Sequence, residues 1–202
     1  MLLPIVRSVM QPKVELPPVL YQLPDFNLKN QDGESVNLKS FEGSAMVVNF
    51  IFTSCPGVCP MFSKQMAKIQ NRIVGLSPAI RLLSISVDPE TDTPSVLKNY
   101  GNEYKANFKS WSFLTGPLDE IKKVVTEGFK LVLQKSDSNF MDITHGEHFV
   151  IVDQIGQIRA FTHARNDTEI NNVIKILALV ANTNPYIKDL NNKETDSAPI
   201  AR

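Results

Sequence analysis

The sequence predicts one α/β domain of three layers, and three observations support this. Apolar segments typical of strands, such as residues 46–52 and 80–87, alternate with amphipathic segments typical of helices. Two further strand-like segments and a last helix then follow between residues 148 and 181. The chain has 202 residues, 43% of them hydrophobic, which suits a single sizeable core. A central sheet flanked by helices is therefore expected.

Composition limits both the partners and the domain organisation. The net charge is zero and the pI is near 6.8, so nothing indicates binding to nucleic acid or to an anionic membrane surface. No apolar stretch reaches the roughly 20 residues of a transmembrane helix, and residues 1–10 are too irregular for a signal peptide. We expect an extended segment at 1–20, a folded domain at 21–182 and a polar, disordered tail at 183–202.

The N-terminal half of the domain begins with a predicted β-hairpin. Two short alternating segments, Asp25–Leu28 and Val36–Leu38, flank the turn signal Asn30–Gly33. Residues 46–52 are almost continuously apolar, as expected of a central strand covered on both faces. Residues 80–87 form the next predicted strand.

Helix boundaries are marked by capping residues and by glycine. A helix over residues 60–74 presents one apolar stripe and ends at Gly75. Thr93 is the predicted N-cap of a second helix, with Pro94 at its first position. After a short strand at 111–114, residues 117–127 form a third helix closed by Gly128.

The C-terminal part is predicted to contain a strand pair and a final helix. Strands at 148–153 and 157–161 surround the turn at 154–156. Either Asn166 or Asp167 caps the helix that follows.

Cys55 and Cys59 are the only cysteines, and they lie between the predicted central strand and the helix beginning at Pro60. Proline favours the first turn of a helix, so Cys59 is predicted at the N-cap and Cys55 in the preceding loop. A thiolate at a helix N-terminus is stabilised by free N–H groups, so we expect a lowered pKa. Such thiolates suit both disulfide exchange and metal binding.

Several common types of cysteine site fit the sequence poorly. A structural disulfide closing so small a loop would constrain the unfolded chain little, and two cysteines are too few for a four-cysteine zinc site. The three intervening residues differ from the two of thioredoxin-type enzymes, and a peroxiredoxin would need proline where Phe50 stands. A redox pair, or a metal site completed by histidine, is favoured.

The chain has three candidate histidines. His145 and His148 lie just before or within a predicted strand, and His163 follows the next strand. Each alone is more often a surface residue than a ligand. A loop histidine that enters a strand beside the cysteine strand, however, can reach the same end of the sheet.

Four segments together carry a specific resemblance. They are Phe50–Pro60, Ser86–Pro94, Trp111–Gly116 and the histidine eight residues before Asp153. In order and spacing, from about Leu23 to Ala181, the chain resembles the Sco/SenC family. That resemblance implies a thioredoxin-like fold, with a mixed β-sheet flanked by helices and an N-terminal β-hairpin. It also implies a copper protein that helps assemble the binuclear copper centre of cytochrome c oxidase.

The resemblance assigns roles to individual residues. Cys55 and Cys59 match redox-active copper ligands, and His145 matches the third ligand; His148 has no counterpart. Asp88 and Asp92 match a segment that supports the site. Two thiolates and an imidazole suit Cu(I) and can hold Cu(II), with zinc as the main competitor.

The implied partner is the copper-bearing subunit of a haem-copper oxidase, with other periplasmic copper carriers or thiol reductants as further partners. The implied location is the periplasm, the outer face of the cytoplasmic membrane, or the mitochondrial intermembrane space. The alternative is a thiol–disulfide oxidoreductase or redox sensor with no copper delivery. His145 discriminates between them, because copper binding needs it and thiol exchange does not.

Overall fold

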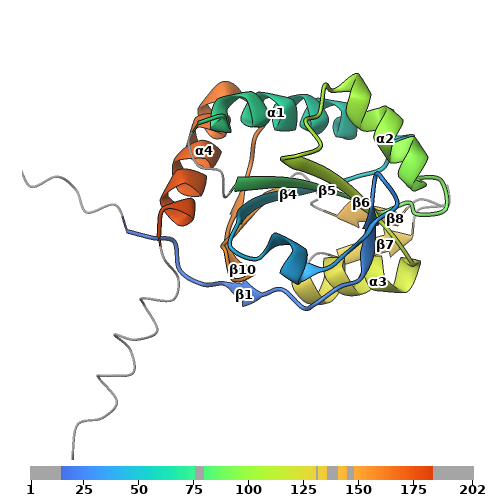
Figure 1. Ribbon diagram of the computed structural model, residues 1–202, viewed down its shortest axis with the longest axis horizontal. Helices are drawn as coiled ribbons and strands as arrows, with labels where there is room; N and C mark the ends of the chain where they lie inside the picture. Colours follow the sequence, from blue (N-terminus) through green and yellow to red (C-terminus); the bar gives the residue numbers. More distant parts are fainter. Residues whose placement is uncertain (1–14, 76–79, 131, 136–140, 145–147, 184–202) are drawn as a thin grey trace, which may run out of the picture.

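A mixed β-sheet forms the centre of the computed structural model (Figure 1), which describes residues 15–75, 80–130, 132–135, 141–144 and 148–183. Within these residues the sheet has eight strands. In order across the sheet they are β1 (Tyr21–Gln22), β10 (Gln157–Thr162), β9 (Phe149–Val152), β4 (Ala45–Ile51), β5 (Ile80–Ser86), β6 (Trp111–Thr115), β2 (Leu28–Asn30) and β3 (Ser35–Val36).

Strand β4 lies in the middle of this sheet, as its apolar sequence predicts. All seven of its residues are buried. It pairs in parallel with β5 from Ala45 to Ile51 and antiparallel with β9 on its other side. Apolar residues on both faces are needed because helices or loops cover each face of the sheet.

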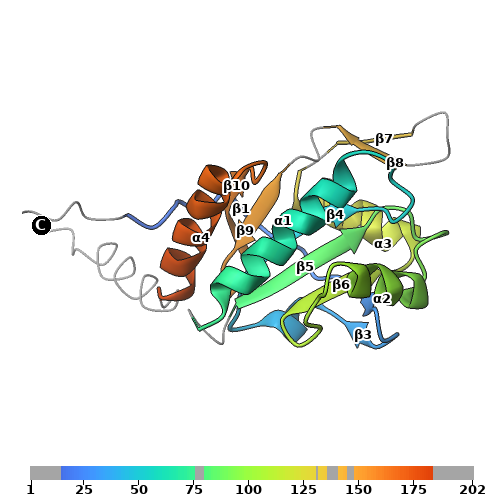
Figure 2. The ribbon, with the colours of Figure 1, turned by 90° about the horizontal axis from the view of Figure 1, so that it is seen from above.

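Two cores lie on opposite faces of the sheet. On one face pack α1 (Val58–Ile73), α2 (Pro94–Glu103) and α4 (Asp167–Ala181) (Figure 1, Figure 2). The other face is covered by α3 (Leu118–Lys123) and the π-helical turn η2 (Val124–Gly128), together with part of the N-terminal segment. This confirms the three-layer α/β arrangement.

The predicted capping residues begin two of the helices. Thr93 accepts a hydrogen bond from the Val96 N–H at 3.4 Å, and Pro94 is the first helical residue. Asn166, rather than Asp167, caps α4 by accepting from the Glu169 N–H at 3.0 Å. None of the described helices is long and apolar enough to cross a bilayer.

Other parts of the fold differ from the sequence-based expectation. The N-terminal hairpin is present as β2 and β3, but the chain then turns into a 3-10 helix, η1 (Leu38–Phe41). A second hairpin, β7 (Val132–Lys135) with β8 (Met141–Thr144), was not predicted. Residues 1–14 and 184–202, which contain most of the two predicted extensions, lie outside the described residues.

Candidate metal centre

The cysteines lie where β4 leads into α1, at the C-terminal end of the central strand. The N-cap of α1 is Gly57, so Cys59 is the second helical residue and the prediction that it is the N-cap is wrong. Pro60 is the third helical residue, two positions later than predicted, and it is tolerated there because N–H groups in the first turn have no intrahelical acceptor. Cys55 lies in the loop, with its N–H donating to the Phe52 carbonyl at 3.2 Å.

Both cysteines are free thiols, and they differ in exposure. Cys55 is half-buried, whereas Cys59 is 5% exposed. Burial, together with hydrogen bonding to Cys55, raises the pKa of Cys59 to about 12 despite a hydrogen bond with the Phe52 backbone. The expectation of a lowered pKa for Cys59 is therefore wrong for the metal-free protein, because loss of hydration outweighs the helix N-terminus. A metal ion that binds Cys59 must displace its proton.

Asp92 anchors the loop that carries Cys55. Its fully buried carboxylate accepts from the Thr53 N–H at 3.1 Å and from the hydroxyls of Thr53 and Ser86. Burial raises the pKa of Asp92, although these hydrogen bonds act in the opposite direction. The carboxylate thus joins Thr53, which follows β4 and lies two residues before Cys55, to Ser86, the last residue of β5.

Asp88 brings a second buried carboxyl group to the same end of the sheet. It is 8% exposed, and its N–H donates to Ser86 Oγ at 3.1 Å. Its Oδ2 atom is buried with no hydrogen-bond partner among the described residues. Burying a carboxylate oxygen without a hydrogen-bond partner costs free energy of folding. A cation bound nearby would offset that cost. The soft donors at this end of the sheet are the two sulfurs of Cys55 and Cys59, which suit a soft metal ion.

His145 lies outside the described residues, so its predicted contact with the cysteines stays a prediction. The described strand that follows it is well placed. Strand β9 pairs antiparallel with β4, so its first residue, Phe149, lies at the end of the sheet where β4 approaches the cysteines. Phe149 also packs edge-on against Phe62 of α1, with ring centroids 5.6 Å apart.

His148 and His163 are described, and neither joins the cysteines. Among the described residues, no group of three or more histidine, cysteine, aspartate or glutamate side chains is arranged to hold a metal ion. The two imidazole rings instead lie beside each other, with centroids 4.6 Å apart. The family resemblance assigns neither residue to the cysteine site, and the sequence contains no sign of their mutual contact.

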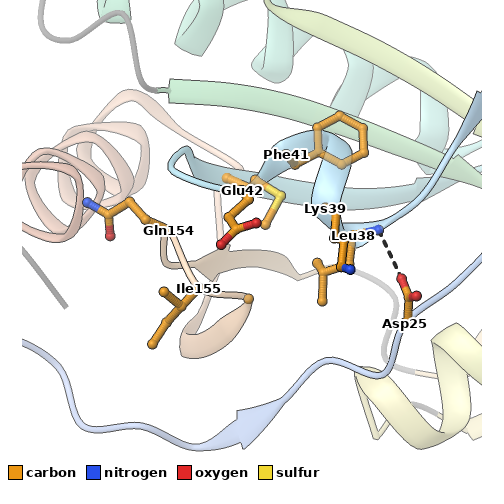
Figure 3. A pocket seen from close by; sticks show the side chains of 9 residues that line it. Asp25, Leu38, Lys39, Phe41, Glu42, Gln154 and Ile155 are labelled. Carbon is orange, nitrogen blue, oxygen red and sulfur yellow. Dashed lines mark hydrogen bonds between the residues drawn. The ribbon is translucent and has the colours of Figure 1, made fainter. Parts of the chain in front are cut away.

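A pocket of about 280 Å³ lies at the opposite end of β4 (Figure 3). Figure 3 shows the Asp25 carboxylate accepting from the Leu38 N–H, at 3.2 Å. The lining contains no cysteine or histidine, and its single soft donor is the thioether of Met46. The lining residues are Asp25, Leu38, Lys39, Phe41, Glu42, Met46, Gln154, Ile155 and Gly156.

Comparison with known proteins agrees with the fold. Residues 20–181 match the family model described as SCO1/SenC. The chain belongs to the SCO1/SenC family. It is 31% identical to the SCO1 protein homolog of Bacillus subtilis over 158 residues, which is 78% of this chain and 81% of that protein.

Solved structures of SCO1/SenC relatives have the same fold. A SCO1/SenC family lipoprotein from Bacillus anthracis is 29% identical, with a TM-score of 0.75 over 83% of this chain and 99% of that one. BsSco, a Sco-family cytochrome c oxidase assembly protein with a disulfide switch, is 29% identical, with a TM-score of 0.73 over 85% and 99%. Copper-bound ScoI from Bradyrhizobium japonicum is 25% identical, with a TM-score of 0.67 over 79% and 99%. The mixed sheet flanked by helices is therefore the thioredoxin-like fold expected from the sequence.

Proposed function

We propose that this protein binds copper through Cys55, Cys59 and His145 and acts in assembly of the binuclear copper centre of cytochrome c oxidase. The observation that carries the proposal is the pair of neighbouring free thiols at the junction of β4 and α1. Copper bound to the ScoI relative and the assembly role of BsSco support it.

The chemistry of the donors favours copper as cargo. Thiolate sulfur selects Cu(I), and an imidazole allows the same site to hold Cu(II). Three protein ligands leave a coordination position through which the metal can pass to a partner. The buried carboxyl oxygen of Asp88 that has no partner among the described residues lies at the same end of the sheet, where a cation would compensate it.

The proposed partner is the copper-bearing subunit of a haem-copper oxidase. Val58, directly before Cys59, keeps 45% of its surface exposed, so an apolar side chain borders the thiols and is available for contact with a partner protein. We place the protein in the periplasm, at the outer face of the cytoplasmic membrane or in the mitochondrial intermembrane space. The lipoprotein relative from Bacillus anthracis supports a location at a membrane surface.

A reversible disulfide between Cys55 and Cys59 is a second proposed property of the same site. The Cys55 side chain is close enough to Cys59 to contribute to the raised pKa of Cys59, and BsSco, a relative, has a disulfide switch. Such a couple serves copper release and also serves a thiol–disulfide oxidoreductase. The two functions differ in one requirement: copper binding needs His145, whereas thiol–disulfide exchange does not.

Anaerobic copper titration of the reduced protein, with metal content measured after desalting, tests the proposal. We expect about one tightly bound copper ion per chain, and loss of tight binding in the Cys55→Ser, Cys59→Ser double variant, because sulfur supplies the soft ligands. Equal copper retention by this double variant would contradict the proposal.

The His145→Ala variant, with His148→Ala as matched control, separates copper delivery from thiol exchange. We expect His145→Ala to lose tight Cu(II) binding and the sulfur-to-copper absorption band but to keep the disulfide couple. His148→Ala should leave the tight site unchanged. If only His148→Ala abolishes tight binding, the ligand is three residues further along. If neither variant matters while the thiols exchange normally with a partner, the oxidoreductase alternative is correct.

A further inference from the structure

The histidines that the proposed copper site does not use form a cross-strand pair. The last residues paired between β9 and β10 are Phe149 and Thr162. The Thr162 hydroxyl closes this ladder by donating to the Phe149 carbonyl at 2.9 Å. His148 and His163 each stand one residue beyond this pair, so the strands hold the two imidazoles opposite each other.

The distance between the rings fits two ligands of one ion. Their centroids are 4.6 Å apart and the ring planes are tilted by 37°. With a metal–nitrogen bond of about 2.0 Å, two imidazoles at a right angle around one ion have centroids about 4.5 Å apart. Phe161 packs edge-on against His148, with centroids 6.3 Å apart, and restricts its ring.

The pair lies at the cysteine end of the sheet and is open to solvent. Strand β9 separates β10 from β4, and it begins at the end where β4 leads to Cys55. His148 and His163 are only partly buried, so an ion from solution can reach them. The adjacent Phe149 contacts Phe62, in the same N-terminal part of α1 as Cys59.

We propose that His148 and His163 form a second, weaker metal site, which binds Cu(II) beside the thiol site. Imidazole nitrogen suits Cu(II), which also accepts water in its remaining positions. Two protein ligands hold an ion less firmly than two thiolates and an imidazole do. The pair is therefore suited to receive copper near the cysteines rather than to store it. Only the choice of copper as the physiological metal rests on the proposed function.

A variant that lacks the proposed thiol site tests the pair directly. In the Cys55→Ser, Cys59→Ser, His145→Ala background we expect one Cu(II) per chain, with electron paramagnetic resonance couplings from two nitrogens. Adding His163→Phe keeps an aromatic ring beside His148 but removes a ligand atom. The affinity for Cu(II) should then fall at least about tenfold, because losing even a residue that only hydrogen-bonds to a metal ligand typically lowers metal affinity by that factor.

The outcomes distinguish this site from the proposed function. Absence of two-nitrogen Cu(II) binding in the background variant, or unchanged binding after His163→Phe, overturns the second site. Thermal unfolding of both variants checks folding. In the otherwise wild-type protein already loaded with one copper, His163→Phe should weaken binding of a second Cu(II) by the same factor, a readout that needs no cysteine substitution. If the thiol site fails to bind copper while the background variant binds it, the proposed function fails and the second site stands.

Discussion

The two ends of the sheet both bury aspartates, but they compensate the charge differently. At the β9–β10 turn, the Asp153 carboxylate contacts Arg159 at 2.7 Å and accepts from the N–H groups of Ile155 and Gln157. At the cysteine end, the Asp92 carboxylate accepts hydrogen bonds from the uncharged groups of Thr53 and Ser86. One carboxylate oxygen of Asp88 has no hydrogen-bond partner among the described residues.

This difference separates a structural end from a reactive end. At the turn, the charges of Asp153 and Arg159 neutralise each other within the protein. Arg159 also donates to the Pro17 carbonyl at 3.2 Å, and this hydrogen bond holds the N-terminal segment against the sheet. Buried groups without an internal counter-charge are instead stabilised when a cation arrives. Binding of a cation is therefore expected to stabilise the cysteine end, but not the turn.

The largest effect is expected from breaking the closed ion pair. Arg159→Met should lower the free energy of unfolding by about 3–5 kcal/mol, because it leaves the Asp153 charge buried and unpaired. Chemical denaturation of the metal-free protein measures this. The control is Lys68→Met, which breaks the exposed Lys68–Asp167 pair and should cost no more than about 1 kcal/mol. Similar losses in both variants would show that the turn is not a structural anchor.

Copper loading should release protons at the reactive end. Burial raises the pKa of Cys59 to about 12, so its thiol keeps its proton at neutral pH until a metal binds the sulfur. Adding Cu(I) to the reduced protein in weak buffer should acidify the solution by at least one proton per copper. Cys59→Ser should release fewer protons. Stoichiometric copper uptake without acidification would exclude Cys59 as a thiolate ligand.

A smaller effect is expected in the pH dependence of stability. Burial raises the pKa of Asp92 above 3.8, so the folded protein holds this proton more tightly than the unfolded chain. The stability that Asp92 contributes is therefore present at low pH and is lost as pH rises through the folded-state pKa. Urea unfolding at several pH values from about 4 to 7 should show the wild type losing stability relative to Asp92→Asn. A difference that stays constant or grows in favour of the wild type would contradict this.

The smallest effect concerns the two helix caps. Thr93→Ala and Asn166→Ala should each lower the free energy of unfolding by about 1 kcal/mol, because each removes an acceptor for a helix N–H. Thr93 follows Asp92 directly, so only Thr93→Ala should also weaken copper binding slightly. Equal copper affinity in both variants would mean that the Asp92 contacts hold the loop without help from the cap.

Sequence alone was sufficient wherever neighbours along the chain determine conformation. The central strand at 46–52 and the cap at Thr93–Pro94 were predicted, because continuous burial and capping each leave a local pattern. The predicted strand before Cys55 and the predicted helix at Pro60 placed both cysteines at a strand-to-helix junction. Family-specific segments then indicated copper, a conclusion that composition could not have provided.

Tertiary structure decided burial and the partners of each side chain. Cys59 has a raised rather than a lowered pKa because the folded core removes water from its sulfur, and its position near a helix start could not reveal this. Asp92 reaches Thr53 across 39 positions, and His148 meets His163 only because β9 and β10 pair in one register. Local sequence determines dihedral angles and caps, but contacts between distant residues arise only when the sheet aligns its strands.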